Sequence, residues 1–218
     1  MGFYRGPNII RDGLVLYLDA ANTKSYPGTG TTWSDLSGNG NNGTLVNGPA
    51  FNTGSNGSIV FDGVNDYTSL ITPVSYPSVW SVNVTLYYYY NSKTFEFFLG
   101  NTTGDSSGKI LLSYNSYISF RNSSYYNFNV LSSEISNKYS NLQFVSNGVS
   151  ILLYVNGEYR SIATPPSTAL PITTIGNAWS DLVWLSKFNL GEIKIYNRAL
   201  TPQEVLQNYN ATKSRFGL

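Results

Sequence analysis

The sequence predicts an all-β fold with one short helix near its C-terminus. Aromatic residues make up 15% of the chain and include 18 Tyr, and aromatic side chains fit the pleated, half-buried surface of a strand better than they fit a helix. Apolar and polar residues alternate in short runs along the whole length, which is the period of a strand. With 218 residues, the chain is long enough for one β-sandwich domain with a single large core.

The clearest alternation lies in residues 80–90, WSVNVTLYYYY. We expect a strand there with one buried face. The side chains expected on the buried face are Trp80, Val82, Val84, Leu86, Tyr88 and Tyr90, and those expected on the other face are Ser81, Asn83 and Thr85. The same period predicts strands around Ile59 and Phe61, around Ile110, Leu112 and Tyr114, around Ile118 and Phe120, and around Ile193 and Ile195.

Residues 139–162 predict a meander of three strands joined by two tight turns. The turns are marked by Asn147-Gly148 and Asn156-Gly157. Asn and Gly accept the positive φ values of a type I′ hairpin turn at little steric cost.

The one predicted helix begins after Thr201 and ends near Lys213. Thr201 is a good cap, Pro202 suits the first helical position because no amide hydrogen is needed there, and Glu204 completes a capping box. Apolar side chains then follow at helical spacing, at Val205, Leu206 and Tyr209.

Composition excludes several classes of function. Charged residues make up 11% of the chain and the formal net charge is +1, so there is no strong field to hold nucleic acid by counterion release. No apolar run approaches the ~20 residues of a membrane span, and residues 1–13 lack the apolar stretch of a secretory signal. The absence of Cys excludes a disulfide framework. We therefore expect no nucleic-acid partner and no membrane insertion.

Six segments in order resemble LamG-like jelly-roll domains of the concanavalin A-like lectin/glucanase superfamily. They are GLVLYLDA, WSDLSGNGNNGTLVNGP, IVFDGVNDY, LLYVNGE, IGNAW and GEIKIYNRALTPQEVLQNYN. The resemblance implies a jelly-roll sandwich of two antiparallel sheets, with the final strand and the short helix returning beside the first strand. It divides the chain into an N-terminal arm (1–12), the jelly-roll domain (13–213) and a C-terminal tail (214–218).

The two ends of the sequence show a more specific resemblance to one group of proteins with this domain. A GPNI-type opening, a DGLVLYLDA strand and a KSRFG tail are similar to virion structural proteins of tailed bacteriophages. This implies a capsid decoration, fibre or tail appendage located in the virion, with other virion proteins or further copies of the chain as partners and a cell-surface glycan as a ligand. Bacterial adhesins carry the same domain, so the alternative is a carbohydrate-binding module of a bacterial surface or secreted protein.

The acidic residues do not predict an active site. Glycoside hydrolysis needs two carboxylates flanking the scissile bond, and on a strand these would stand two residues apart. Glu96, Glu134, Glu158 and Glu192 have no acidic neighbour at that spacing. The chain also has no His, which removes the usual general base. We expect no enzymatic activity and assign no catalytic residue.

Oxygen-bearing side chains gather in two Gly-rich segments and suit a hard cation such as Ca²⁺. They are Asp35 and Asn39 in the first segment, and Asp62, Asn65 and Asp66 in the second. Many LamG-like domains carry calcium at a loop edge, so the resemblance implies the same site here. The alternative is that these side chains accept hydrogen bonds from their own backbone in Asx-turns, which need no ion. No cofactor is required in that case.

Four tyrosines are candidates for contact with a glycan, because a sugar ring stacks its apolar side on an aromatic face. Tyr87 and Tyr89 point away from the apolar face of their strand, and Tyr125 with Tyr126 lies in the loop-like segment RNSSYYNFN. The alternative for Tyr87 and Tyr89 is cross-strand pairing or packing against another subunit.

Overall fold

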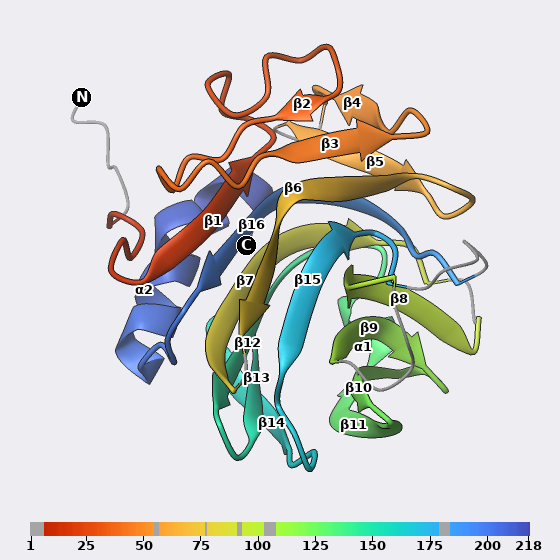
Figure 1. Ribbon diagram of the computed structural model, residues 1–218, viewed down its shortest axis with the longest axis vertical. Helices are drawn as coiled ribbons and strands as arrows, with labels where there is room; N and C mark the ends of the chain where they lie inside the picture. The colour runs from red at the N-terminus through yellow and green to blue at the C-terminus, as the bar shows by residue number, and fades with distance from the viewer. Residues whose placement is uncertain (1–6, 55–56, 77, 91–92, 103–107, 179–183) are drawn as a thin grey trace.

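Two antiparallel sheets packed face to face form the molecule (Figure 1), which confirms the predicted jelly-roll sandwich. The computed structural model describes residues 7–54, 57–76, 78–90, 93–102, 108–178 and 184–218. Sheet A has the strand order β14-β13-β12-β7-β16-β5-β4, with β1 also paired to β16, and sheet B has the order β11-β10-β9-β8-β15-β6-β3-β2. The pairing of β1 with β16 confirms that the final strand returns beside the first strand.

The elements have the following bounds. Sheet A contains β1 (Leu14–Asp19), β4 (Ala50–Asn52), β5 (Ser58–Asp62), β7 (Val79–Tyr88), β12 (Tyr139–Asn147), β13 (Ile151–Val155), β14 (Glu158–Ala163) and β16 (Lys187–Tyr196). Sheet B contains β2 (Thr32–Trp33), β3 (Gly43–Val46), β6 (Tyr67–Tyr76), β8 (Phe95–Gly100), β9 (Lys109–Tyr114), β10 (Tyr117–Asn122), β11 (Ser124–Leu131) and β15 (Leu170–Ile175). The helical elements are α1 (Ser132–Ile135), α2 (Pro202–Thr212) and the 3₁₀ helix η1 (Lys213–Phe216).

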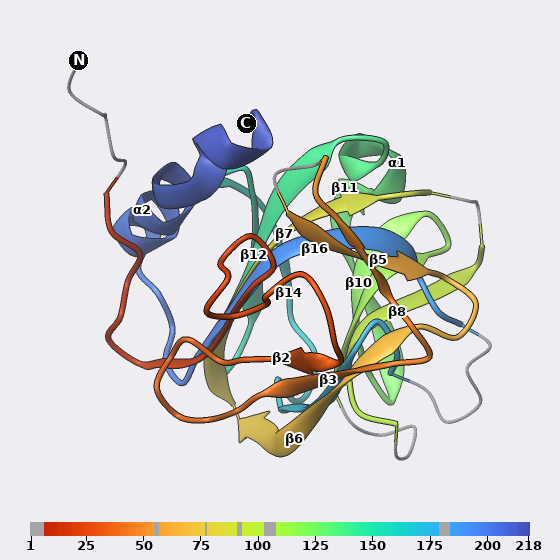
Figure 2. The same ribbon diagram turned by 90° about the horizontal axis from the view of Figure 1, so that it is seen from above.

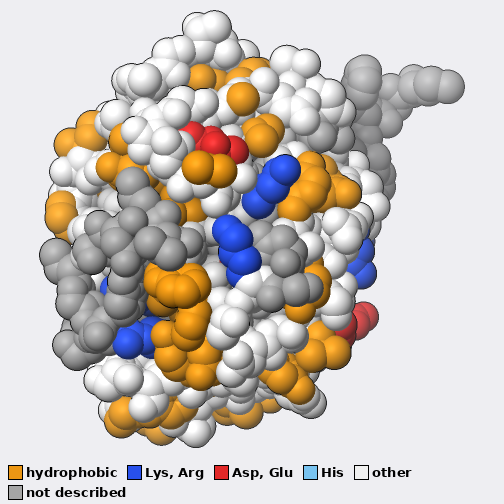
Figure 3. Space-filling view, turned by 90° about the vertical axis from the view of Figure 1, so that its right-hand side faces the viewer, with side chains coloured by type: hydrophobic (Ala, Val, Ile, Leu, Met, Phe, Trp, Pro, Cys, Tyr) orange, Lys and Arg blue, Asp and Glu red, His pale blue; other side chains and the backbone are white. Residues whose placement is uncertain are grey.

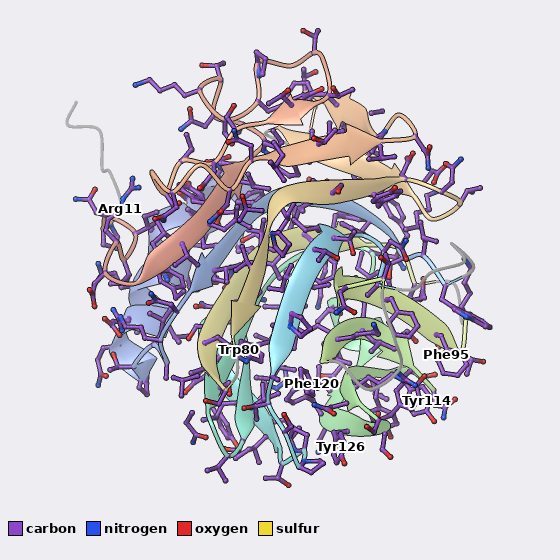
Figure 4. All side chains as sticks on the ribbon, in the orientation of Figure 1. Arg11, Trp80, Phe95, Tyr114, Phe120 and Tyr126 are labelled. Carbon is purple, nitrogen blue, oxygen red and sulfur yellow. The ribbon has the colours of Figure 1, made fainter. Side chains whose placement is uncertain are left out.

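The main core fills the space between the two sheets. Trp80 of β7 and Phe120 of β10 come from opposite sheets, are fully buried, and place their ring centroids 6.2 Å apart (Figure 4). The Trp80 indole N–H donates to the carbonyl of Thr168 at 2.6 Å, so the buried polar group of this large side chain is satisfied.

Strand β7 departs from the expectation of a single buried face. Trp80 and its alternate neighbours face the core as predicted, but Ser81, Asn83 and Thr85 are also buried. The residues after β16 cover that second face: Ser81 Oγ donates to the carbonyl of Arg198 at 2.8 Å. Figure 2 shows α2 on the side of sheet A that faces away from sheet B. Alternation in the sequence predicted the strand but not the cover on its polar face.

Tyr114 in β9 lies on a different face from the one predicted. Ile110 and Leu112 belong to the main core, whereas Tyr114 packs with a separate cluster on the outer face of sheet B. The pairing of β9 with β10 shifts register between Tyr117 and Ser119. An extra residue in a ladder moves the side chains that follow it to the other face.

The predicted meander is confirmed as β12, β13 and β14. At Asn156-Gly157 both residues have positive φ, as a type I′ turn requires. At Asn147-Gly148 only Gly148 has positive φ, and the side-chain oxygen of Asn147 accepts hydrogen bonds from the amides of Val149 and Ser150. This turn is therefore longer than predicted.

The described part of the predicted arm, residues 7–12, docks on α2. The amide of Ile10 donates to Asn208 Oδ1 at 2.9 Å, and its carbonyl accepts from the hydroxyl of Tyr196 at 3.1 Å. The remainder of the arm, residues 1–6, lies outside the described residues. Within the described part of the chain, no helix is long and apolar enough to cross a membrane.

The predicted C-terminal tail is packed against sheet A. Phe216 is buried and lies on Gly191 of β16, where an added Cβ would come 2.3 Å from the Phe216 ring. Only glycine leaves room for this contact. The tail thus closes the outer face of sheet A together with α2.

The edges of the two sheets are protected at both ends. The edge strands β11 and β14 meet, since the Asn129 amide donates to Ser161 Oγ at 2.8 Å, and Arg160 of β14 pairs with Glu134 of α1, which directly follows β11. At the opposite end the edge strands are β2 and β4, which are two and three residues long.

Candidate functional site

Four partly buried aromatic side chains gather on the outer face of sheet B. They are Phe95 of β8, Tyr114 of β9, Tyr125 of β11 and Trp184 in the segment before β16, and we call them the aromatic cluster. They pack on the buried side chains of Phe97, Leu111 and Ala178. The cluster is therefore supported from beneath by apolar residues of the sheet.

The rings of the aromatic cluster are in direct contact. Tyr114 and Tyr125 stack with centroids 3.7 Å apart and planes 9° from parallel. Phe95 meets Trp184 edge to face at 4.9 Å, an arrangement that is favourable for aromatic pairs. Figure 4 shows Phe95 and Tyr114 together at the right of the molecule.

The cluster borders a small pocket of about 160 Å³ lined by Phe95, Phe97, Tyr125 and Trp184. All four lining side chains are aromatic. Figure 3 views the side of the molecule on which β8 and β9 lie, and shows hydrophobic side chains gathered close to Lys and Arg side chains.

Cationic side chains lie next to the aromatic cluster. Arg121 of β10 is paired in the sheet with Lys109 on one side and Tyr125 on the other, and its guanidinium carbon lies 5.1 Å from the Tyr125 ring centroid. Lys109 is buried, and its Nζ donates to the carbonyl oxygen of Asn101 at 2.8 Å. Both cations are therefore buried beside the aromatic cluster.

Glu96 lies between two pocket residues in the sequence, but its side chain points into the core. Its carboxyl accepts a hydrogen bond from the hydroxyl of Tyr88 in sheet A. Burial raises the pKa of Glu96 to about 7, although the hydrogen bond from Tyr88 and the charge of Lys93 favour the ionised form. A group with this pKa is half protonated at neutral pH.

The four tyrosines predicted as glycan contacts are separated in the structure. Residues 124–131 form strand β11 rather than a loop, so the neighbours Tyr125 and Tyr126 point to opposite faces. Tyr125 joins the aromatic cluster and Tyr126 packs against the main core. Tyr87 and Tyr89 lie on the outer face of sheet A, on the other side of the sandwich.

Tyr87 makes the cross-strand contact that was the alternative to glycan binding. It is paired with Tyr139 of β12, with ring centroids 5.6 Å apart. Tyr89 lies 4.8 Å from Tyr87, and its ring centroid is 5.2 Å from the Nζ of Lys187.

In the first predicted calcium segment, Asp35 is surrounded by donors from its own loop and from β1. Its two oxygens accept hydrogen bonds from the amides of Tyr17, Ser37 and Asn41 at 2.8 to 3.0 Å, and from the Ser37 hydroxyl. The Asn39 side chain donates to the carbonyl of Leu14 at 3.2 Å. This is the hydrogen bonding of an Asx-turn.

The second predicted calcium segment has a similar arrangement. Asp62 accepts from the amides of Val64 and Asn65, and Asp66 accepts from the amide of Asp62. Burial raises the pKa of Asp66 above its ordinary value. Among the described residues no group of three or more His, Cys, Asp or Glu side chains is placed to hold a metal ion. Calcium binding stays a prediction.

Folding brings together one carboxylate pair that spacing in the sequence could not predict. Asp19 of β1 is paired with Glu192 of β16 across the ladder. Arg215 donates to both oxygens of Asp19 at 2.9 Å, and Lys194 lies 2.7 Å from Glu192. Burial opposes ionisation of Glu192, but Lys194 and Arg215 outweigh it and lower its pKa. Both carboxylates are therefore held as ion pairs under the C-terminal tail.

Three members of the aromatic cluster were not predicted as site residues: Phe95, Tyr114 and Trp184. One local signal existed, since Phe95 and Phe97 alternate around Glu96 in TFEFF and so share a face. Nothing local indicated that this face is the outer one, because the assignment depends on the bulge in β9 and on strands far apart in the sequence.

Comparison with known proteins gives a family match and several structural likenesses. The profile of the concanavalin A-like lectin/glucanases superfamily matches residues 53–206. No curated protein sequence matches the chain significantly.

Three solved structures illustrate the shared fold. Domain 4 of AbnA, a GH43 extracellular arabinanase from Geobacillus stearothermophilus, in complex with arabinotriose, has a TM-score of 0.67 and 20% identity over 90% of this chain and 98% of that chain. The binding domain of Paraclostridial Mosquitocidal Protein 1 has a TM-score of 0.66 and 19% identity over 92% of this chain and 52% of that chain. Trypanosoma rangeli sialidase in complex with sialic acid has a TM-score of 0.65 and 14% identity over 93% of this chain and 33% of that chain.

Proposed function

Because the chain belongs to the concanavalin A-like lectin/glucanases superfamily, we propose that it binds a carbohydrate through the aromatic cluster on sheet B. The observation that carries the proposal is the pocket lined by Phe95, Phe97, Tyr125 and Trp184. Partly exposed rings over an apolar floor offer flat surfaces on which the C–H groups of a sugar pack. Binding sites for small molecules are commonly aromatic-lined hollows with a few polar groups at the margin, and the exposed side chain of Asn127 lies two residues from Tyr125 on β11.

Known structures of the same fold support the proposal. The arabinanase domain was solved with arabinotriose, and it shares the fold over nearly its whole length. Arabino-oligosaccharides therefore belong in the array of plant, bacterial and animal glycans against which the chain is tested.

Two substitutions in the aromatic cluster test the proposal. Trp184→Ala and Tyr125→Ala should each weaken binding of the best array ligand at least about tenfold, because buried aromatic contacts carry most of the energy of a binding site. Tyr159→Ala is the matched control, since Tyr159 is 53% exposed on β14 and lies outside the pocket. Binding is measured by calorimetry. A ligand that binds both cluster variants as tightly as the native chain would place the site elsewhere, and an empty array would reject the proposal.

We propose that binding is not followed by catalysis. Asp19 and Glu192 are adjacent carboxylates, but each is ion-paired, to Arg215 and to Lys194, and Glu192 is fully buried. The two carboxylates are not arranged as a free acid and a free base on opposite sides of a sugar. Chromatography of the sugars after incubation with the ligands found above should show no cleavage. Any cleavage would overturn this proposal. Cleavage that persists in an Asp19→Asn variant would be the work of other residues.

We further propose that the chain is a virion appendage of a tailed phage, with a bacterial surface or secreted adhesin as the alternative. Figure 4 places Arg11 at the left of the molecule, and Phe95 and Tyr114 at the right. The described N-terminal segment thus lies on the opposite side from the aromatic cluster, which suits attachment at one end and ligand contact at the other. Gold-labelled antibody against the chain should decorate purified phage particles. Label confined to bacterial surfaces or culture medium would favour the adhesin.

A further inference from the structure

The pocket beside the aromatic cluster is small for a carbohydrate site. Its volume of about 160 Å³ is close to that of an apolar cavity that holds a single benzene, about 150 Å³. Sites that enclose a whole ligand usually measure about 300 to 1,000 Å³. The pocket therefore admits one edge or one substituent of a sugar, while the rest of the sugar stays outside.

The lining of the pocket determines which part of a sugar can enter. The side chains of Phe95 and Phe97 contribute only carbon, so that the hydroxyl of Tyr125 and the indole N–H of Trp184 are the only polar side-chain groups of the lining residues. A hydroxyl group moved into such surroundings loses its hydrogen bonds to water without gaining full replacements. A methyl group loses none and gains contact with the rings. The entering group should therefore be a methyl.

Polar side chains stand outside the pocket, where the hydroxyls of the same sugar would lie. Asn127 is exposed and follows Tyr125 by two residues on β11, so it shares the outer face. It pairs in the sheet with Ser119, whose hydroxyl donates to Asn127 Oδ1 at 2.6 Å. Arg121 lies over the Tyr125 ring. An apolar hollow next to an exposed amide group matches a sugar that carries a methyl on one edge and hydroxyls on the others.

We infer that the aromatic pocket selects a methyl-bearing sugar at a chain end or branch. This inference rests on the proposed carbohydrate function. Two classes of sugar carry such a methyl: N-acetylhexosamines, on the acetamido group, and 6-deoxyhexoses, on C5. An internal unit of an unsubstituted glucan or arabinan has no group that suits the pocket.

The test compares sugars that differ at the methyl-bearing position. The free sugars L-fucose and L-galactose form one pair, L-rhamnose and L-mannose a second, and N-acetyl-D-glucosamine and D-glucose a third, so that only one member of each pair carries a methyl. Binding is followed by NMR at the indole N–H signals of the four Trp residues, and the Trp184→Phe variant identifies the signal of Trp184. At least one methyl-bearing sugar should shift the Trp184 signal and bind about tenfold more tightly than its hydroxylated partner.

The outcomes separate this inference from the broader proposal. Preference within the deoxy pairs alone assigns 6-deoxyhexoses, and preference within the third pair alone assigns N-acetylhexosamines. Equal affinity within all three pairs, or no response of Trp184 to any of these sugars while an array glycan binds through the aromatic cluster, would overturn the inference and leave the carbohydrate function standing. The Tyr159→Ala variant should keep the same preference, whereas Tyr125→Ala should lose it.

Discussion

The single residue Glu96 places an ionisable carboxyl group inside the core, and this group makes the stability of the fold depend on pH. Its pKa in the folded chain, about 7, lies above the ordinary value of 4.5. The folded state therefore keeps a proton that the unfolded state has already released. The stabilisation that this retained proton gives the folded state is complete below about pH 4.5 and is lost as the pH rises through 7. The free energy of unfolding falls by about 3 kcal/mol over this range.

Replacing Glu96 with Gln should remove this pH dependence. The amide keeps an oxygen that can accept from Tyr88, but it does not ionise. Urea unfolding of the native chain should show a free energy of unfolding that falls between pH 5 and pH 8, and the Glu96→Gln variant should show a flatter profile. Parallel profiles for the two proteins would mean that another group titrates.

Asp35 decides between the two interpretations of the loop before β3. Because its oxygens already accept four hydrogen bonds from the protein, we expect the melting temperature to be the same in calcium and in chelator. Asp35→Ala should lower the free energy of unfolding by about 2 kcal/mol in both conditions, since the amide of Tyr17 loses its partner. A melting temperature that rises with calcium in the native chain but not in the variant would establish an ion site instead.

At the scale of the element, the start of α2 shows what the local sequence can predict. The helix begins at Pro202 after Thr201, and the side chains of Thr201 and Glu204 each accept from the other's backbone amide. The predicted capping box is thus confirmed. All the groups involved lie within four residues of each other, so short-range pattern was sufficient.

The cap should have a measurable effect on stability. Thr201→Ala removes the acceptor for the Glu204 amide and should cost about 1 kcal/mol. Thr201→Ser keeps the hydroxyl and is the control, with a cost close to zero. Thermal unfolding of both variants checks this, and equal destabilisation by Ala and Ser would show that the threonine methyl, rather than its hydroxyl, matters.

Strands and turns were predictable to the extent that they depend on neighbouring residues. The meander β12-β13-β14 follows from alternation and two Asn-Gly pairs. The short strands β2 and β4 and the one-turn helix α1 carry too few residues for a period to be visible. The bulge that turns Tyr114 outward depends on how two strands pair, which no single segment encodes.

At the scale of the whole molecule, the binding and structural clusters unite residues that are distant in the sequence. The aromatic cluster joins positions 95, 114, 125 and 184, and the ion pairs join positions 19, 192, 194 and 215. Of the aromatic cluster only Tyr125 was predicted as a site residue, because the sheet order that assembles the others is a property of the complete fold. The jelly-roll architecture itself was predictable, since it needs only the order of strands and turns.

The ion pairs under the tail should stabilise the whole fold. Arg215→Ala leaves the largely buried carboxylates of Asp19 and Glu192 with one cation fewer, which should cost about 3 kcal/mol or more. Arg160→Ala is the matched control, because its pair with Glu134 is exposed on both sides and should be worth less than about 1 kcal/mol. Denaturant unfolding of the two variants measures both costs, and similar values would show that the tail contributes little.

The short or mutually covered edge strands also matter when many copies of the chain are crowded together. A long open edge invites a neighbour to add its own strand, and repeated addition leads to fibrils. Here β11 and β14 face each other, and β2 and β4 offer three residues at most. The side of β1 that does not pair with β16 is covered by the loop before β3, since Leu36 and Asn41 donate to its carbonyls. Dense arrays of this protein should therefore remain free of amyloid. Thioflavin fluorescence of a concentrated solution should accordingly stay at its background level.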